Sequence, residues 1–119
     1  MPMKNYFKPD EFKCRCGCND NIMDDIFMIK INLARHTSNI PYIINSGKRC
    51  IKHNKEVGGT SDSSHLKGIA ADIKAEDSTT RFKIMIGLLH SGFSRIGIAK
   101  TFIHADCDQT KGFNVMWVY

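Results

Sequence analysis

The stretch Ser63–Asp72, which reads SSHLKGIAAD, begins with residues typical of a loop and ends with residues typical of a buried strand. Gly68 allows a tight backbone turn shortly after His65. The apolar run that follows predicts a strand over residues 69–75, which carries Asp72. The pattern therefore predicts a histidine at the end of a flexible loop and an aspartate on the strand that follows it.

A second polar segment, His104-Ala105-Asp106, falls on a late predicted strand. His104 and Asp106 share one face, because side chains on a strand repeat every two residues. Histidine and aspartate are zinc ligands, and a catalytic zinc takes three protein ligands and keeps one position open for water. His65, Asp72 and His104 satisfy that count, but spacing alone does not separate a metal site from unrelated polar residues.

Hydrophobic periodicity predicts two long helices. The first covers about residues 20–37 after an Asn19 or Asp20 cap. Its predicted core stripe is Ile22, Ile26, Ile29 and Leu33, widened by Met23, Phe27 and Ala34. The second begins at a Ser78 cap and stops at Gly92, and its predicted core face is Phe82, Met85, Ile86 and Leu89.

The other predicted elements are short. They are a strand over 42–44, a helix over 49–57, and strands over 95–99, 101–106 and 115–119. Helices and strands do not alternate regularly, and this favours an α+β fold with a small, mostly antiparallel sheet and two main helices.

The size and composition suit one globular domain over residues 1–119 with a cysteine-rich N-terminal lead-in. No apolar run is long enough for a membrane span, and the start of the chain lacks the apolar core of a signal peptide. Lys plus Arg exceeds Asp plus Glu by 17 − 12 = 5. This excess favours polyanionic partners such as nucleic acid, anionic lipid or cell-wall polymers, and the scattered basic residues do not choose among them.

Three of the five cysteines crowd into Cys14, Cys16 and Cys18, whereas Cys50 and Cys107 stand alone. The odd number argues against a closed disulfide framework. A site of four thiolates usually draws on two close pairs, and Cys50 and Cys107 form no second pair. The sequence therefore favours a structural or redox-labile loop over a zinc knuckle.

Several ordered motifs resemble one known family. Residues 63–72 match SxHxxGxAxD, residues 46–49 resemble SGxR, residues 54–59 resemble NxxVGG, and residues 102–106 resemble FxHxD. The Phe12–Cys18 lead-in also recurs in small members. Together they resemble the zinc D-alanyl-D-alanine carboxypeptidase family, which shares its fold with the hedgehog signalling domain.

The resemblance implies a zinc-dependent peptidase that cleaves peptidoglycan stem peptides, as a carboxypeptidase or an endopeptidase. It makes His65, Asp72 and His104 the Zn²⁺ ligands. Arg49 is then a catalytic residue that also binds substrate with Ser63, since a guanidinium can bind a carboxylate or a developing oxyanion.

The general base is the open assignment. Many relatives have a carboxylate three residues before the last zinc histidine, where this chain has Thr101. Asp106 is the best substitute, and Asp108 is a weaker one. Asp106 could instead orient a ligand, or bind zinc itself while His104 acts catalytically.

Two settings and two other function classes are compatible with this pattern. We expect a monomer without nucleic-acid partners that is cytoplasmic until it is released to the cell wall, as a phage-type lysis enzyme, or a component of a phage particle. One alternative is a non-catalytic, zinc-stabilised binding module, which the lack of a carboxylate at Thr101 keeps open. The other, a nucleic-acid-binding protein, lacks a basic stripe or a paired CxxC.

Overall fold

The computed structural model describes residues 4–119, so the first three residues of the predicted domain lie outside the described part. Within that part, five strands form one sheet in the order β1-β2-β4-β3-β5. The strands are β1 (Ile44–Ser46), β2 (Ala70–Lys74), β3 (Arg95–Ile98), β4 (Phe102–Asp106) and β5 (Val115–Val118). The β3–β5 pair is parallel and the other pairs are antiparallel, which confirms the predicted mostly antiparallel α+β architecture.

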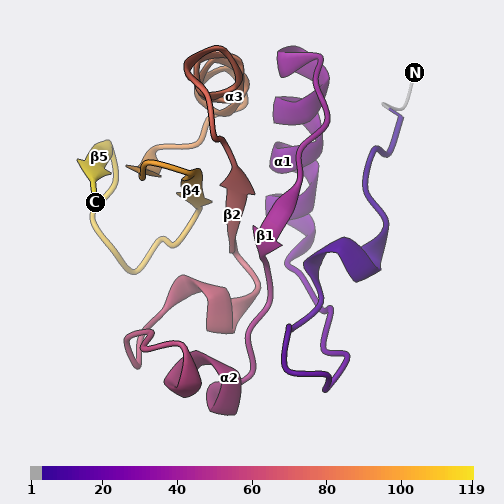
Figure 1. The fold of residues 1–119 in the computed structure, drawn as a ribbon, viewed down its shortest axis with the longest axis vertical. Helices are drawn as coiled ribbons and strands as arrows, with labels where there is room; N and C mark the ends of the chain where they lie inside the picture. The colour runs from indigo at the N-terminus through magenta and orange to yellow at the C-terminus, as the bar shows by residue number, and fades with distance from the viewer. Residues whose placement is uncertain (1–3) are drawn as a thin grey trace.

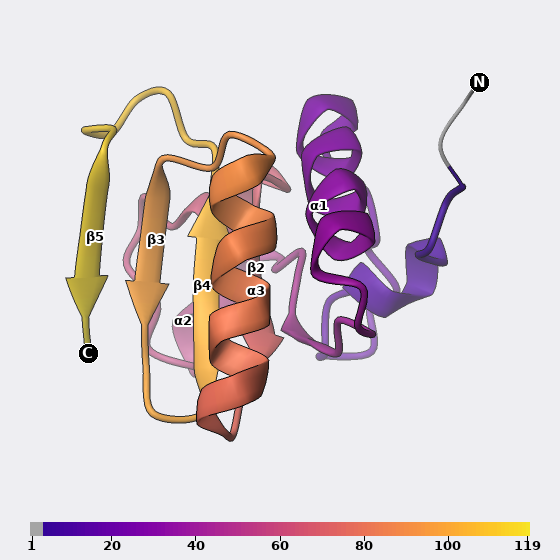
Figure 2. The same ribbon diagram turned by 90° about the horizontal axis from the view of Figure 1, so that it is seen from above.

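Two long helices, α1 (Asp25–Ser38) and α3 (Ser78–His90), pack side by side over one face of the sheet (Figures 1 and 2). The short helix α2 (Ile51–Glu56) and the 3-10 turn η2 (Ser64–Lys67) lie toward the other face. The N-terminal segment, which contains the 3-10 turn η1 (Pro9–Phe12), runs along the outer side of α1 and β1 (Figure 1). The long helices therefore cover the apolar face of the sheet, and the opposite face lies toward α2 and η2.

The predicted core face of the first helix is only partly correct. Ile22, Ile26 and Ile29 are exposed, whereas Phe27 and Ala34, which were predicted to widen the stripe, are buried together with Ile31 and Ser38. The helix also begins later than predicted, because the Asp24 carboxylate accepts a hydrogen bond from the Phe27 amide and caps it. Residues before Asp24 belong instead to the loop that follows the cysteines.

The predicted core face of the second helix is mostly wrong, and of its four residues only Met85 packs, partly buried, against the core. Phe82, Ile86 and Leu89 are exposed, and the buried positions are Ile84, Gly87 and Leu88. A Cβ atom on Gly87 would lie 2.3 Å from the Ala34 carbonyl oxygen. α1 and α3 approach each other closely at Gly87, and a pattern based on large apolar side chains does not identify such a position.

The predicted short elements agree more closely with the structure. The strands over 69–75, 95–99, 101–106 and 115–119 and the helix over 49–57 each contain an observed element. The predicted strand over 42–44 is shifted, since β1 starts at Ile44 and Tyr42 is a core residue instead. Gly92, at φ +90°, follows the end of α3 as expected.

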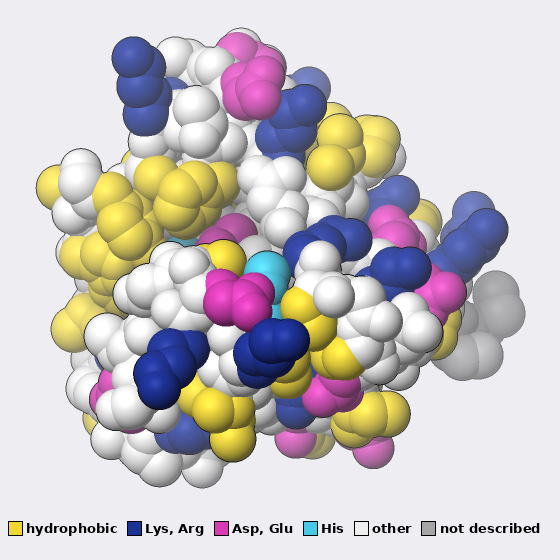
Figure 3. Space-filling view, turned by 60° about the horizontal axis from the view of Figure 1, so that its bottom comes forward, with side chains coloured by type: hydrophobic (Ala, Val, Ile, Leu, Met, Phe, Trp, Pro, Cys, Tyr) yellow, Lys and Arg dark blue, Asp and Glu magenta, His cyan; other side chains and the backbone are white. Residues whose placement is uncertain are grey.

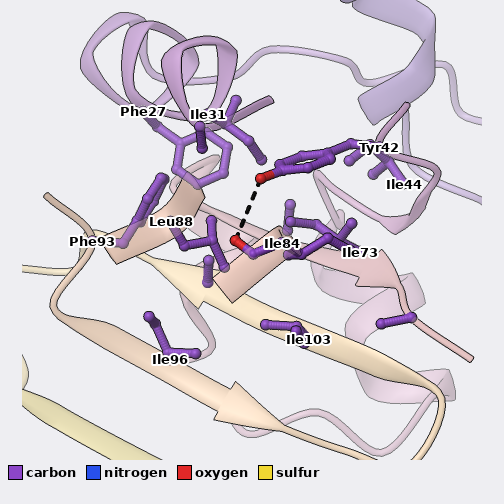
Figure 4. Packing of buried hydrophobic residues seen from close by; sticks show 14 of the residues in the cluster. Phe27, Ile31, Tyr42, Ile44, Ile73, Ile84, Leu88, Phe93, Ile96 and Ile103 are labelled. Carbon is purple, nitrogen blue, oxygen red and sulfur yellow. Dashed lines mark hydrogen bonds between the residues drawn. The ribbon is translucent and has the colours of Figure 1, made fainter. Parts of the chain in front are cut away.

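The core lies between the sheet and the long helices, where Phe27 and Ile31 of α1 meet Leu88 of α3 and Ile103 of β4 (Figure 4). Burial of each such side chain stabilises the fold by about 1.5–3 kcal/mol. The buried Tyr42 hydroxyl donates to the Ile84 carbonyl at 3.5 Å. Within residues 4–119, no helix has the length and apolar character needed to cross a membrane.

Candidate metal centre

A row of paired residues crosses the sheet and brings the predicted site together. Strand register pairs Ser46 with Asp72, Asp72 with His104, His104 with Gly97, and Gly97 with Trp117. Ile73, which follows Asp72 on β2, and Ile103, which precedes His104 on β4, point into the core. Because side chains alternate along a strand, Asp72 and His104 point to the opposite face, away from the long helices.

Trp117 is a member of this row that the sequence reasoning missed. Its ring centroid lies 5.6 Å from that of His104. A Cβ atom on Gly97 would lie 2.5 Å from the indole Nε1, so only glycine leaves room for the indole. The strand prediction over 115–119 places Trp117 on a sheet, but the parallel pairing with β3 that brings it beside His104 has no local signal.

His65 reaches the row from η2. The Ser63 hydroxyl accepts a hydrogen bond from the His65 amide at 3.3 Å, and Gly68, at φ +70°, ends the turn. The His65 Nδ1 atom lies 2.8 Å from the Gly47 carbonyl oxygen. Since a carbonyl only accepts, Nδ1 carries the proton and Nε2 presents a lone pair toward Asp72.

His65, Asp72 and His104 offer three ligand atoms within 4.8 Å of one another. His65 Nε2 lies 3.4 Å from Asp72 Oδ1, and His104 Nδ1 lies 2.9 Å from the same oxygen. Zinc ligands of these types bind at about 2.0–2.2 Å in tetrahedral sites, so neighbouring donors should be about 3.4 Å apart. The donor set therefore fits one zinc ion, and we call these three residues the histidine centre.

The electrostatics of the histidine centre favour a cation. Burial alone would raise the pKa of Asp72, but its interactions with His104 and His65 outweigh burial and hold that pKa well below its usual range. Burial would lower the pKa of His104, but hydrogen bonds to Asp106 and Asp72 outweigh it and raise that pKa. A negative environment surrounds the imidazole, and a bound metal cation would compensate it.

Asp106 is a buried residue that contacts His104. Its Oδ2 atom accepts a hydrogen bond from His104 Nε2 at 2.7 Å, and Arg95 Nε donates to its Oδ1 at 2.8 Å. The Asp108 amide also donates to this carboxylate, which is 2% exposed. Its contacts are those of a carboxylate that orients a ligating histidine.

Arg49 lies next to the histidine centre on the segment between β1 and α2. Its guanidinium contacts the Ser46 hydroxyl and the Asn54 side-chain oxygen at 3.2 Å each, and Nη2 lies 3.8 Å from Asp72 Oδ2. A Cβ atom on Gly59 would lie 2.1 Å from that Asn54 oxygen. The glycine of the NxxVGG motif thus permits the packing that holds Arg49.

These residues line a cleft of about 410 Å³, which includes the histidine centre, Arg49, Ser63 and Trp117. Figure 3 shows histidine surface in a hollow, with acidic and basic side chains beside it. A larger hollow of about 750 Å³ is lined by Lys67 and Asp108 but by no histidine. We assign the chemistry to the smaller cleft because the metal-ligating groups converge there.

The remaining sequence candidates lie elsewhere. Asp108 is buried in contacts with Ser64 and Lys67, which anchor η2 to the loop after β4. Thr101 is exposed just before β4 and is absent from the residues that line the cleft.

Two histidines and one aspartate that converge on a cleft, with an arginine beside them, form a donor set of the kind that mononuclear metallohydrolases use. A model of the Peptidase M15 family matches residues 5–106. The chain therefore belongs to the M15 peptidases, the family of zinc D-alanyl-D-alanine carboxypeptidase-like enzymes. No curated protein matches the chain in a sequence comparison.

Proposed function

We propose that this protein is a zinc-dependent peptidase that hydrolyses the stem peptides of peptidoglycan. The observation that carries the proposal is the convergence of His65, Asp72 and His104 at a cleft where Arg49 also lies. Zinc bound there would supply a Lewis acid and a bound water of lowered pKa. Membership of the M15 family supports a peptide substrate from the cell wall.

Arg49 is proposed to bind the anionic part of the substrate. Its guanidinium lines the cleft, and its closest hydrogen-bond partners, Ser46 and Asn54, are neutral. It can accept a peptide's terminal carboxylate or stabilise the negative charge that develops on the scissile carbonyl oxygen. The first role suits a carboxypeptidase and the second suits an endopeptidase.

Asp106 is proposed as a positioning residue. It accepts a hydrogen bond from His104 Nε2, so that Nδ1 is directed toward Asp72. Arg95 holds Asp106 in turn, and both are nearly enclosed. Ser63 is proposed to contribute by capping η2 and by forming part of the cleft wall.

We further propose that the protein acts as a monomer, because the fold of a single chain brings the three ligand atoms of the histidine centre within 4.8 Å of one another and needs no second copy to do so. Its proposed setting is lysis of a bacterium by a phage, in which the enzyme reaches the wall through a membrane lesion made by another protein. The proposed activity itself does not depend on that setting.

The test is digestion of purified peptidoglycan with and without a chelator, followed by mass analysis of the products. We expect zinc-dependent release of terminal D-alanine from a carboxypeptidase, or of larger peptide fragments from an endopeptidase. Zinc-loaded, folded protein that releases neither product would contradict the proposal and favour a non-catalytic binding module.

A further inference from the structure

A second group of metal-ligating side chains lies outside the cleft. Cys14, Cys16, Cys18 and Cys50 each place a sulfur atom within 4.8 Å of the other three. Cys50 is more than thirty residues from the other three in the sequence, so the fold alone brings it to them. We call these four residues the cysteine cluster.

The distances within the cysteine cluster fit a tetrahedral metal site. Cys14 Sγ lies 3.4 Å from Cys16 Sγ and 3.7 Å from Cys50 Sγ, and Cys16 and Cys50 are 3.6 Å apart. Four thiolates around zinc at about 2.3 Å have neighbouring sulfurs about 3.8 Å apart. A disulfide needs sulfurs about 2.05 Å apart, and all four cysteines are free. We propose that the cysteine cluster is a second metal site, which binds structural zinc through four thiolates.

The backbone is arranged to turn the thiols inward. Gly17, between Cys16 and Cys18, has φ +91°, a backbone conformation that favours glycine. A Cβ atom at this position would meet no other atom, so the turn requires glycine for its backbone conformation and not for space. The Cys14 amide donates to the Asp20 carbonyl at 2.7 Å and closes the loop. This hydrogen bond joins the two ends of the cysteine loop.

Backbone amides point at the sulfurs. The Cys50 amide donates to Cys14 Sγ, and the His53 amide donates to Cys50 Sγ, each at 3.4 Å. Such bonds stabilise the negative charge of metal-bound thiolates and orient them.

The proposed site supports the cleft mechanically through residues 47–50. The Gly47 carbonyl accepts from His65, the Lys48 amide donates to the Phe12 carbonyl at 2.8 Å, Arg49 lines the cleft, and Cys50 joins the cluster. A Cβ atom on Gly47 would lie 2.8 Å from Phe12 Cα, so the lead-in packs directly on this segment. Zinc in the cysteine cluster would clamp the lead-in to the segment that presents Arg49.

The first test counts zinc in protein purified under reducing conditions. We expect two zinc ions per chain in the wild type and one in Asp72→Ala, which removes a ligand of the histidine centre only. The cysteine cluster does not depend on the proposed peptidase activity, and Asp72→Ala separates the two. An Asp72→Ala protein that folds and carries no zinc would overturn the second site, whether or not the wild type is a peptidase.

Cysteine variants identify the ligands. In the Asp72→Ala background, we expect Cys16→Ser and Cys50→Ser to lose the remaining zinc and Cys107→Ser to keep it. Cys107 is the matched control, because it is a half-buried cysteine outside the cluster. Zinc retained by both cluster variants would contradict the assignment.

Two measurements on the wild type need no cysteine variant. Cobalt(II) substitution should give the strong visible bands and the thiolate-to-metal charge-transfer absorption of a tetrahedral thiolate site. In zinc-loaded protein, a thiol reagent should modify one cysteine per chain, and all five after a chelator and denaturant are added. Five reactive thiols in the zinc-loaded protein, or an intact mass four hydrogens short from two disulfides, would overturn the proposal.

Discussion

The histidine centre and the cysteine cluster lie at opposite ends of residues 47–50, yet they are built for different tasks. The histidine centre takes its ligands from β2, β4 and η2, mixes nitrogen with oxygen, and faces a cleft. The cysteine cluster takes three sulfurs from one loop and a fourth from the start of α2. Three ligands leave a coordination position for water or substrate, whereas four thiolates leave none. This difference in ligands and surroundings suits the histidine centre to the catalytic role and the cysteine cluster to the structural role that we propose for them.

The largest expected effect comes from removing a ligand of the histidine centre. Asp72→Ala should abolish zinc-dependent hydrolysis, because the ion and the group that pairs with both histidines are lost together. Peptidoglycan digestion and zinc content provide the measurement. Glu76→Gln, an exposed carboxylate just beyond the same strand, is the control and should retain both. Full hydrolysis by Asp72→Ala would contradict the assignment of the catalytic role to the histidine centre.

The next effect is on stability. Cys50→Ser should lower the free energy of unfolding by about 4 kcal/mol when zinc is present at about a thousand times its Kd, since that binding energy is no longer available to the folded state. Thermal unfolding with and without zinc measures it, with Cys107→Ser as the control. If Cys50→Ser and wild type unfold alike in zinc, the cysteine cluster has no structural role.

Arg49→Ala should lower turnover about 10²–10³-fold, the usual effect of losing one preorganised donor to developing charge. Both zinc ions should remain, since Arg49 is a ligand in neither site. Arg81→Ala removes a guanidinium that donates to the Lys100 carbonyl, away from the cleft, and serves as the control. Loss of the fold rather than of turnover in Arg49→Ala would make the residue structural.

Asp106→Asn separates the two roles considered for this carboxylate. If Asp106 orients His104, zinc affinity at the histidine centre should fall about 10–100-fold, and saturating zinc should restore most of the activity. If Asp106 is the general base, the variant stays inactive at any zinc concentration. Hydrolysis rates across a zinc titration distinguish the two results.

The smallest effect is a pH dependence. The pKa of His104 is raised in the folded, metal-free protein: burial would lower it, but hydrogen bonds to Asp106 and Asp72 outweigh burial. The stability from this charged imidazole is present below the unfolded pKa of about 6.5 and is lost as pH rises through the higher folded value. Zinc needs the neutral ring, so its stabilising effect should grow over the same range. Thermal unfolding of metal-free and zinc-loaded protein measures both slopes, and Asp106→Asn should flatten the metal-free slope.

Part of this structure is predictable from local sequence. The strands that carry Asp72 and His104 have apolar runs and a period of two, and the loop before Asp72 has its own turn residues, so the elements that carry the histidine centre follow from short patterns. Both long helices were also predictable, but their buried faces were predictable only in part. Gly87 is small, and its importance comes from how closely the helices approach.

Contacts between residues that lie far apart in the sequence could not be predicted from the sequence. Arg95 holds Asp106 only because β3 pairs with β4. Cys50 completes the cysteine cluster only because the N-terminal lead-in packs against residues 47–50, and a rule based on close cysteine pairs missed it. Such contacts are properties of the folded chain and have no local signal.

The most direct test follows zinc content and peptidoglycan hydrolysis in the same sample as a chelator is added in steps. The open histidine centre should lose its ion first. We therefore expect hydrolysis to disappear as the content falls from two zinc ions per chain to one, while the protein stays folded, and to return when zinc is restored. Undiminished hydrolysis by protein that has lost all its zinc would contradict the assignment of this chain as a zinc peptidase.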